Sequence, residues 1–107
     1  MYVIDINKDL VPYTFNIALD GVMYEFRIDY NNTADLFTVS LAKNGVTLCT
    51  AEPIVYGLPL FEDLKNRGNF PSVVIKPVDE SGENNAVTFD NLSRTVLLQV
   101  SGGGYDE

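Results

Sequence analysis

The residues best placed to do chemistry are acidic and lie close together in the C-terminal part of the chain. Asp79, Glu80 and Glu83 supply three carboxylates within the stretch DESGE, and Asp90 follows shortly after. Hard cations such as Ca²⁺ take oxygen ligands of this kind, so a surface calcium site at 79–83 is conceivable. The spacing does not match an EF-hand loop, and polar stretches of this composition are ordinary turns. We therefore favour a solvated hairpin tip without a metal.

Nucleophilic and general acid–base chemistry have few residues to use. The chain contains no histidine, which removes the commonest general base and histidine metal ligation. The single cysteine, Cys49, lies in the strand-like stretch VTLCTA, where a small buried hydrophobe is the simpler interpretation. We expect no catalytic residue, no cofactor, no metal and no enzymatic activity.

Charge and hydropathy narrow the classes of partner. Seven Lys and Arg against 15 Asp and Glu give a formal net charge of −8. A field of this sign repels phosphate, so nucleic acid and anionic membrane surfaces are not expected partners. No apolar run is close to the length of about 20 residues that a membrane helix needs. The N-terminal stretch MYVIDINKDL lacks the features of a signal peptide. We expect the chain to be made and folded in a cytoplasm.

The chain is organised around the stretch 13–30, YTFNIALDGVMYEFRIDY. Apolar and polar residues alternate on both sides of Asp20-Gly21, which predicts two strands joined by a two-residue type I′ turn. The predicted register pairs Leu19 with Val22, Ile17 with Tyr24, Phe15 with Phe26 and Tyr13 with Ile28. This register places every large apolar residue on one face of the sheet.

Further strands are predicted at 2–7, 36–43, 46–51, 72–78, 87–89 and 94–100, with core-facing Phe37, Val39 and Leu41 in the second of these. A length of 107 residues suits one domain with its own core. The fold class is therefore all-β: a small antiparallel β-barrel or sandwich of about seven to eight strands over residues 1–100. Residues 101–107, SGGGYDE, have the composition of a flexible tail.

The connection at 53–71, PIVYGLPLFEDLKNRGNFP, does not alternate and contains three prolines. Within it, 61–67 is predicted to form one or two helical turns ending at Gly68. Two interpretations stay open: a cap that closes one end of the core, or an ordered interaction surface. Large apolar residues outside the alternating pattern are the candidate interface anchors, because aromatic residues are enriched where partners bury surface. These candidates are Tyr56, Leu58, Phe61, Phe70 and Tyr105.

Taken in order, these features resemble the baseplate plug proteins of contractile-tailed phages, a family of short proteins of the kind known from cyanophage. The resemblance rests on the Asp-Gly hairpin near position 20, on Gly57-Leu58-Pro59-Leu60, and on Asp90-Asn91-Leu92-Ser93-Arg94 before a terminal apolar strand. It covers nearly the whole chain except the tail. It implies a non-enzymatic structural component of the virion, at the centre of a tail baseplate, that binds hub, spike or tube proteins and occurs in several copies.

A different function class is also open to a small β domain. The alternative is a ligand-binding module, for example one that recognises carbohydrate. It predicts a concave aromatic site near Tyr56 and Phe61.

Overall fold

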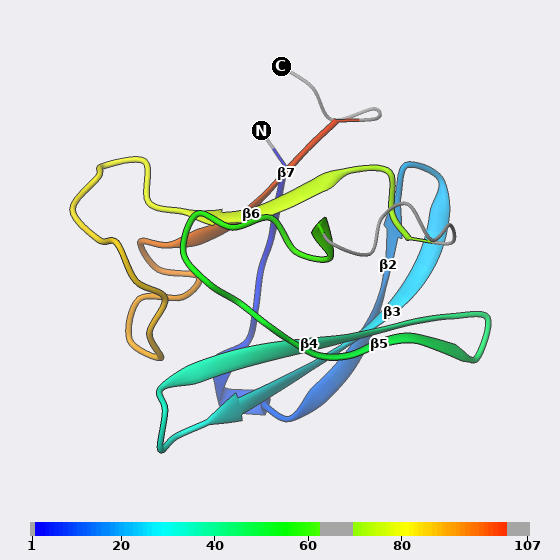
Figure 1. Ribbon diagram of the computed structural model, residues 1–107, viewed down its shortest axis with the longest axis horizontal. Coiled ribbons are helices and arrows are strands. Elements are labelled where there is room, and N and C mark those ends of the chain that lie inside the picture. The colour runs from blue at the N-terminus through cyan, green and yellow to red at the C-terminus, as the bar shows by residue number, and fades with distance from the viewer. Residues whose placement is uncertain (1, 63–69, 103–107) are drawn as a thin grey trace.

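The computed structural model describes residues 2–62 and 70–102, and in this part of the chain seven strands form two antiparallel sheets (Figure 1). The strands are β1 (Tyr2–Ile4), β2 (Tyr13–Leu19), β3 (Val22–Asn31), β4 (Leu36–Lys43), β5 (Val46–Pro53), β6 (Val74–Val78) and β7 (Leu97–Ser101), with a short 3₁₀ helix, η1, at Lys8–Leu10. The all-β prediction is confirmed. In the described residues the sheets enclose the core as a sandwich and do not close into a barrel.

The hairpin of β2 and β3 has the predicted register. Leu19 pairs with Val22, Ile17 with Tyr24, Phe15 with Phe26 and Tyr13 with Ile28. Asp20 and Gly21 have φ angles of 52° and 80°, the left-handed values that a type I′ turn requires at both central positions. The side chains of Phe26 and Ile28 are fully buried, so the turn sets which face of the sheet meets the core.

Gly21→Val is expected to lower the free energy of unfolding by about 1–2 kcal/mol, because a β-branched residue is strained at positive φ. A Cβ at Gly21 would meet no atom within 4 Å, so the loss is backbone strain and not a clash. Asn tolerates the left-handed region, so Gly21→Asn serves as the matched control and should lose clearly less. Urea unfolding of both variants measures this, and equal losses would rule out strain at this turn.

The four-stranded sheet has the order β2-β3-β4-β5. Phe37, Val39 and Leu41 of β4 point to the core and are fully buried, as the alternation predicts. The pairing of β4 with β5 shifts register on both sides of Leu41, a β-bulge that bends the edge strand β5. After β5 the chain leaves this sheet and runs to the edge of the other one (Figure 1).

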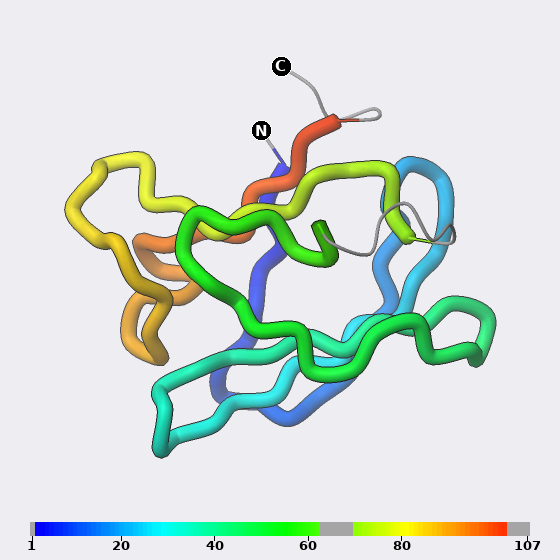
Figure 2. Tube along the Cα trace, viewed as in Figure 1, coloured from blue at the N-terminus to red at the C-terminus, as the bar shows by residue number. Residues whose placement is uncertain are grey.

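The three-stranded sheet has the order β1-β7-β6 and covers the open side of the core. The connection after β5 lies beside its edge strand β6 (Figure 1): Gly57 N–H donates to Pro77 O at 2.9 Å, and Leu60 N–H donates to Ile75 O at 2.8 Å. Figure 2 shows the segment 79–96 as a separate lobe between β6 and β7. The connection thus occupies an edge that would otherwise present unpaired backbone groups.

Several element boundaries differ from the prediction. The first strand ends at Ile4, the sixth begins at Val74 and the last begins at Leu97. The strand predicted at 87–89 is wrong, because these residues have no strand pairing and instead wrap around the side chain of Asn91. Most of the helical turn predicted at 61–67 lies outside the described residues. Among the residues that are described, no helix is long and apolar enough to cross a membrane.

Candidate functional site

A hollow lies where β5 ends and the connection to β6 begins. It has a volume of about 360 Å³ and is lined by Glu52, Pro53, Val55, Leu58, Pro59 and Glu62. We call it the β5-end groove. Val55 is 42% exposed and Leu58 is 58% exposed, so large apolar side chains meet solvent between two carboxylates. A groove of this size lies at the low end of the range for binding pockets, about 300–1,000 Å³.

A tight turn presents the apolar side chains of the β5-end groove. Leu58 N–H donates to Val55 O at 3.0 Å, and Gly57 has a φ of 76°. A four-residue turn with positive φ at its third residue is a type II turn, for which glycine is favoured at that place. Gly57 N–H also donates to Pro77 O of β6 at 2.9 Å. The sequence VYGL therefore holds Val55 and Leu58 on a turn that is tied to the neighbouring sheet.

Tyr56 does not line the β5-end groove, and its hydroxyl fixes the turn to another part of the chain. Its hydroxyl accepts a hydrogen bond from Asp79 N–H at 3.0 Å and lies 3.4 Å from Asp79 O. The phenol ring is half-buried and packs against the core. Tyr56 thus joins the turn to the acidic loop after β6.

The acidic loop at 79–83 is held together by Asp79 itself. This residue is only 6% exposed, and Ser81 N–H and Oγ donate to its Oδ1 at 2.9 and 2.7 Å. Asn84 N–H and Nδ2 donate to its Oδ2 at 3.0 and 2.8 Å. Glu80 and Glu83 are exposed. Within the described ranges no group of three or more acidic, cysteine or histidine side chains is arranged to hold a metal ion.

Hydrogen bonds from Ser81 and then Asn84 lower the pKa of Asp79 from 3.8 to about 2. The ionised carboxylate is thus favoured in the folded state, so its stabilisation is present above pH about 4 and is lost as pH falls toward 2. We expect Asp79→Asn to be less stable than the wild type at pH 6, and this gap to close between pH 4 and 2. Urea unfolding across this range measures the gap. A gap independent of pH would contradict the assignment.

Phe61 lies inside the core and not on the surface. Its side chain is 1% exposed, and its ring centroid lies 6.3 Å from that of Phe26 in an edge-on contact and 5.8 Å from that of Phe70. Phe61 has a φ of 62°, and its N–H donates to Glu52 Oε2 at 3.1 Å. Phe70 is half-buried beside it. Tyr105 lies outside the described residues.

The two interpretations of the connection apply to different side chains. Ile54, Leu60 and Phe61 are each 1% exposed and cap the core, whereas Val55 and Leu58 face solvent. Of the two rings that a carbohydrate site would need, Phe61 is buried, whereas Tyr56 is half-buried and lines a separate hollow of about 250 Å³ beside Ala86 and Val87.

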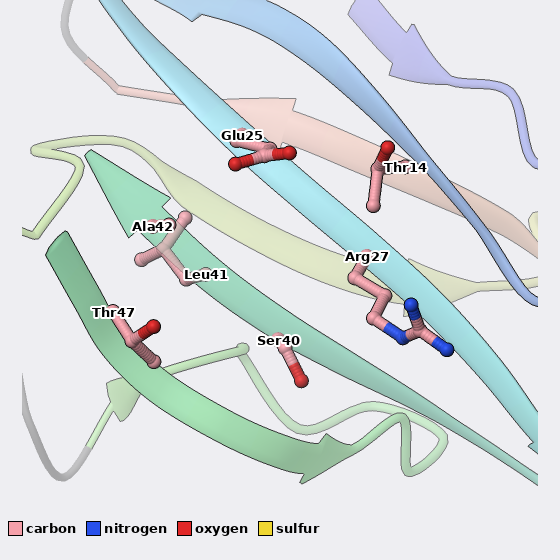
Figure 3. Close-up of a pocket in the computed structure, with 7 residues that line it drawn as sticks. All are labelled: Thr14, Glu25, Arg27, Ser40, Leu41, Ala42 and Thr47. Atoms are coloured by element: carbon pink, nitrogen blue, oxygen red, sulfur yellow. The ribbon is translucent and has the colours of Figure 1, made fainter. Parts of the chain in front are cut away.

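A second, smaller hollow lies on the outer face of the four-stranded sheet. Figure 3 shows side chains from β2, β3, β4 and β5 around a shallow space of about 180 Å³. Arg27 is held by a bidentate contact with Asp29 at 3.0 and 3.2 Å, so its guanidinium is already paired.

The thiol of Cys49 is half-buried and does not line this hollow. Burial, and then the charge of Glu52, raise the pKa of the thiol. The thiol is therefore protonated at neutral pH and is a poor nucleophile.

Comparison with known proteins decides the family. A family model described as "Cyanophage baseplate Pam3 plug gp18" matches residues 1–102 of the chain. The chain belongs to this family of phage baseplate plug proteins. No curated protein matches it. Membership of the baseplate plug family supports a structural role in the tail baseplate of a virion, in association with other baseplate components.

Among the described residues that line the groove of this plug protein, Leu58 is one of the interface anchors predicted from the sequence. Glu52, Val55 and Glu62 also line the groove but were not predicted. The Val-Tyr-Gly-Leu pattern was the available signal for the turn, since glycine at the third position favours a type II turn. The exposure of Val55 and Leu58 on this turn is seen only in the structure. The hydrogen bond from Phe61 N–H to the Glu52 carboxylate joins the connection to the end of β5, and no local sequence pattern predicts it.

Proposed function

We propose that this protein is a non-enzymatic plug at the centre of a tail baseplate, where it acts through contacts with hub, spike or tube proteins. The observation that carries this proposal is the family match over residues 1–102, nearly the whole chain. The protein is assembled into the baseplate in the host cytoplasm and is present in several copies. A small sandwich with a continuous apolar core is a rigid body suited to such a place.

The interface that we propose is centred on the β5-end groove. Leu58 contacts the partner directly, because its side chain is 58% exposed on a fixed turn. Tyr56 and Phe61 act indirectly, because they hold the turn and the end of β5 in place. Phe70 and Tyr105 belong to the same proposed interface. Large apolar anchors at the centre of an interface contribute most of its binding energy.

A pull-down with each tail protein encoded by the same phage tests the proposal. The purified full chain should retain at least one of the hub, spike or tube proteins. Leu58→Ser should reduce this retention at least tenfold, because it removes the exposed apolar anchor. Met23→Ser is the matched control, since Met23 is 57% exposed on β3 and lies outside the groove. A chain that stays monomeric and retains no tail protein would refute the proposed function.

A further inference from the structure

The β5-end groove combines apolar and acidic surface in a way that specifies a partner. Its floor exposes Val55 and Leu58, and its lining includes the carboxylates of Glu52 and Glu62. A wholly apolar partner would bury these charges without a counter-charge, which is unfavourable. A partner that carries both an apolar side chain and a cation satisfies both parts of the lining.

Among the described residues, no cation is paired with either carboxylate. In the part of the chain that the structure describes, neither Glu52 nor Glu62 forms an ion pair. Four of the five described cations are engaged elsewhere: Arg27 with Asp29, Arg94 with Asp90, Lys8 over the ring of Phe89, and Lys43 over the ring of Tyr24. The negative potential of the groove is therefore not neutralised by these residues, and the net charge of −8 adds to it.

Two parts of the groove, the Glu52 carboxylate and the turn that carries Leu58, are held in place before any partner binds. The carboxylate of Glu52 is oriented by the N–H of Phe61 at 3.1 Å. The turn that carries Leu58 is closed by its own hydrogen bond and tied to Pro77 of β6. Pro53 and Pro59 restrict the backbone on both sides. Such preorganisation lowers the entropic cost of binding.

We infer that the β5-end groove binds an exposed segment of a partner protein in which Lys or Arg lies next to a large apolar side chain. This inference rests on the proposed function and names the chemistry of the partner at that site. Charge complementarity favours such a partner over a second copy of this chain, because the copy would bring a further net charge of −8. It also disfavours acidic partners.

Peptide titrations followed by NMR test the inference with the ¹⁵N-labelled full chain. The probe is the peptide GSKLFKSG, and the comparison peptides are GSELFESG, with acidic flanks, and GSKAAKSG, without the apolar pair. GSKLFKSG should bind saturably and shift the amide signals of Val55, Gly57 and Leu58. Binding of each comparison peptide should be at least tenfold weaker, and 0.5 M salt should weaken binding of GSKLFKSG.

Variants locate the binding and separate its two components. Leu58→Ser should weaken binding of GSKLFKSG at least tenfold, and Glu62→Gln should weaken it severalfold and reduce its salt dependence. Met23→Ser should leave binding unchanged, because Met23 is exposed on β3 and does not line the groove. Thermal unfolding of each variant checks that the fold is kept.

Three results would overturn the inference: equal binding of the acidic peptide, shifts confined to residues outside the groove, or self-association of the chain that Leu58→Ser abolishes. The pull-down separates this failure from a failure of the proposed function. A chain that retains a tail protein but ignores GSKLFKSG overturns the partner chemistry alone. A chain that binds GSKLFKSG but retains no tail protein overturns the baseplate role.

Discussion

Replacement of Phe61 by alanine is expected to lower the free energy of unfolding by about 3–5 kcal/mol, the usual loss for a large buried aromatic side chain. The ring is 1% exposed and contacts Phe26 and Phe70, so its removal leaves a cavity between the end of β5 and the hairpin. The backbone strain at φ 62° remains in the variant, because alanine does not relieve it. Urea unfolding with linear extrapolation measures the loss.

Leu58→Ala is the control for this variant. Leu58 lies three residues away on the same connection but is 58% exposed, so its truncation should change the free energy of unfolding by no more than about 0.5 kcal/mol. The two variants together separate the capping residue from the surface residue. Comparable losses at both positions would mean that Leu58 is also part of the core and that the β5-end groove is not an open surface.

The second large effect is expected at Asn91, which is 5% exposed in the lobe between β6 and β7. Its Oδ1 accepts from Thr88 N–H at 2.9 Å, and its Nδ2 donates to Ala86 O at 3.0 Å. Asn91→Ala leaves the N–H of the half-buried Thr88 without a partner, at about 1–3 kcal/mol, and removes the bond to Ala86 O, at about 1 kcal/mol because Ala86 is exposed to solvent. We therefore expect a total loss of about 2–4 kcal/mol of unfolding free energy.

Asn32→Ala is the matched control for Asn91→Ala, because Asn32 is exposed in the turn between β3 and β4. It should change the unfolding free energy by no more than about 0.5 kcal/mol. Urea unfolding monitored by tyrosine fluorescence serves for both variants. If Asn91→Ala were as stable as the control, the side chain would not be what organises residues 86–91.

The sequence predicted best where local and tertiary requirements agree. In the hairpin of β2 and β3, the alternation of apolar residues and the Asp20-Gly21 turn specify the same register, and the structure has that register. The core face of β4 follows from the same period of two. These elements need no information about distant parts of the chain.

The strand prediction is wrong where a side chain makes the backbone hydrogen bonds that a neighbouring strand would otherwise make. The stretch 87–89 has the composition of a short strand, but the amide side chain of Asn91 takes the backbone groups of Thr88 and Ala86. Short polar side chains compete with sheet hydrogen bonds in this way. The sequence offers no way to see which competitor prevails, because the outcome depends on the burial of Asn91.

The interaction surface predicted at 53–71 stays a prediction, and the structure shows that its residues lie in different environments. An irregular connection rich in apolar residues pointed to 53–71, and the groove lies there. Alternation cannot assign faces in a segment without a regular period. The left-handed backbone at Phe61 turns its ring into the core, while the type II turn at Gly57 leaves Leu58 outside. Both depend on contacts with Glu52 and β6 that come from the fold.

A density map of the intact tail tip, resolved well enough to trace strands, would show whether this chain is the plug of the baseplate. We expect to find the two sheets of this chain at the centre of the baseplate. We also expect that Leu58 is buried against a neighbouring protein, with a Lys or Arg of that protein within 4 Å of the Glu52 or Glu62 carboxylate, the usual limit for an ion pair. A tail tip without this chain, or one in which the β5-end groove faces solvent, would contradict these expectations.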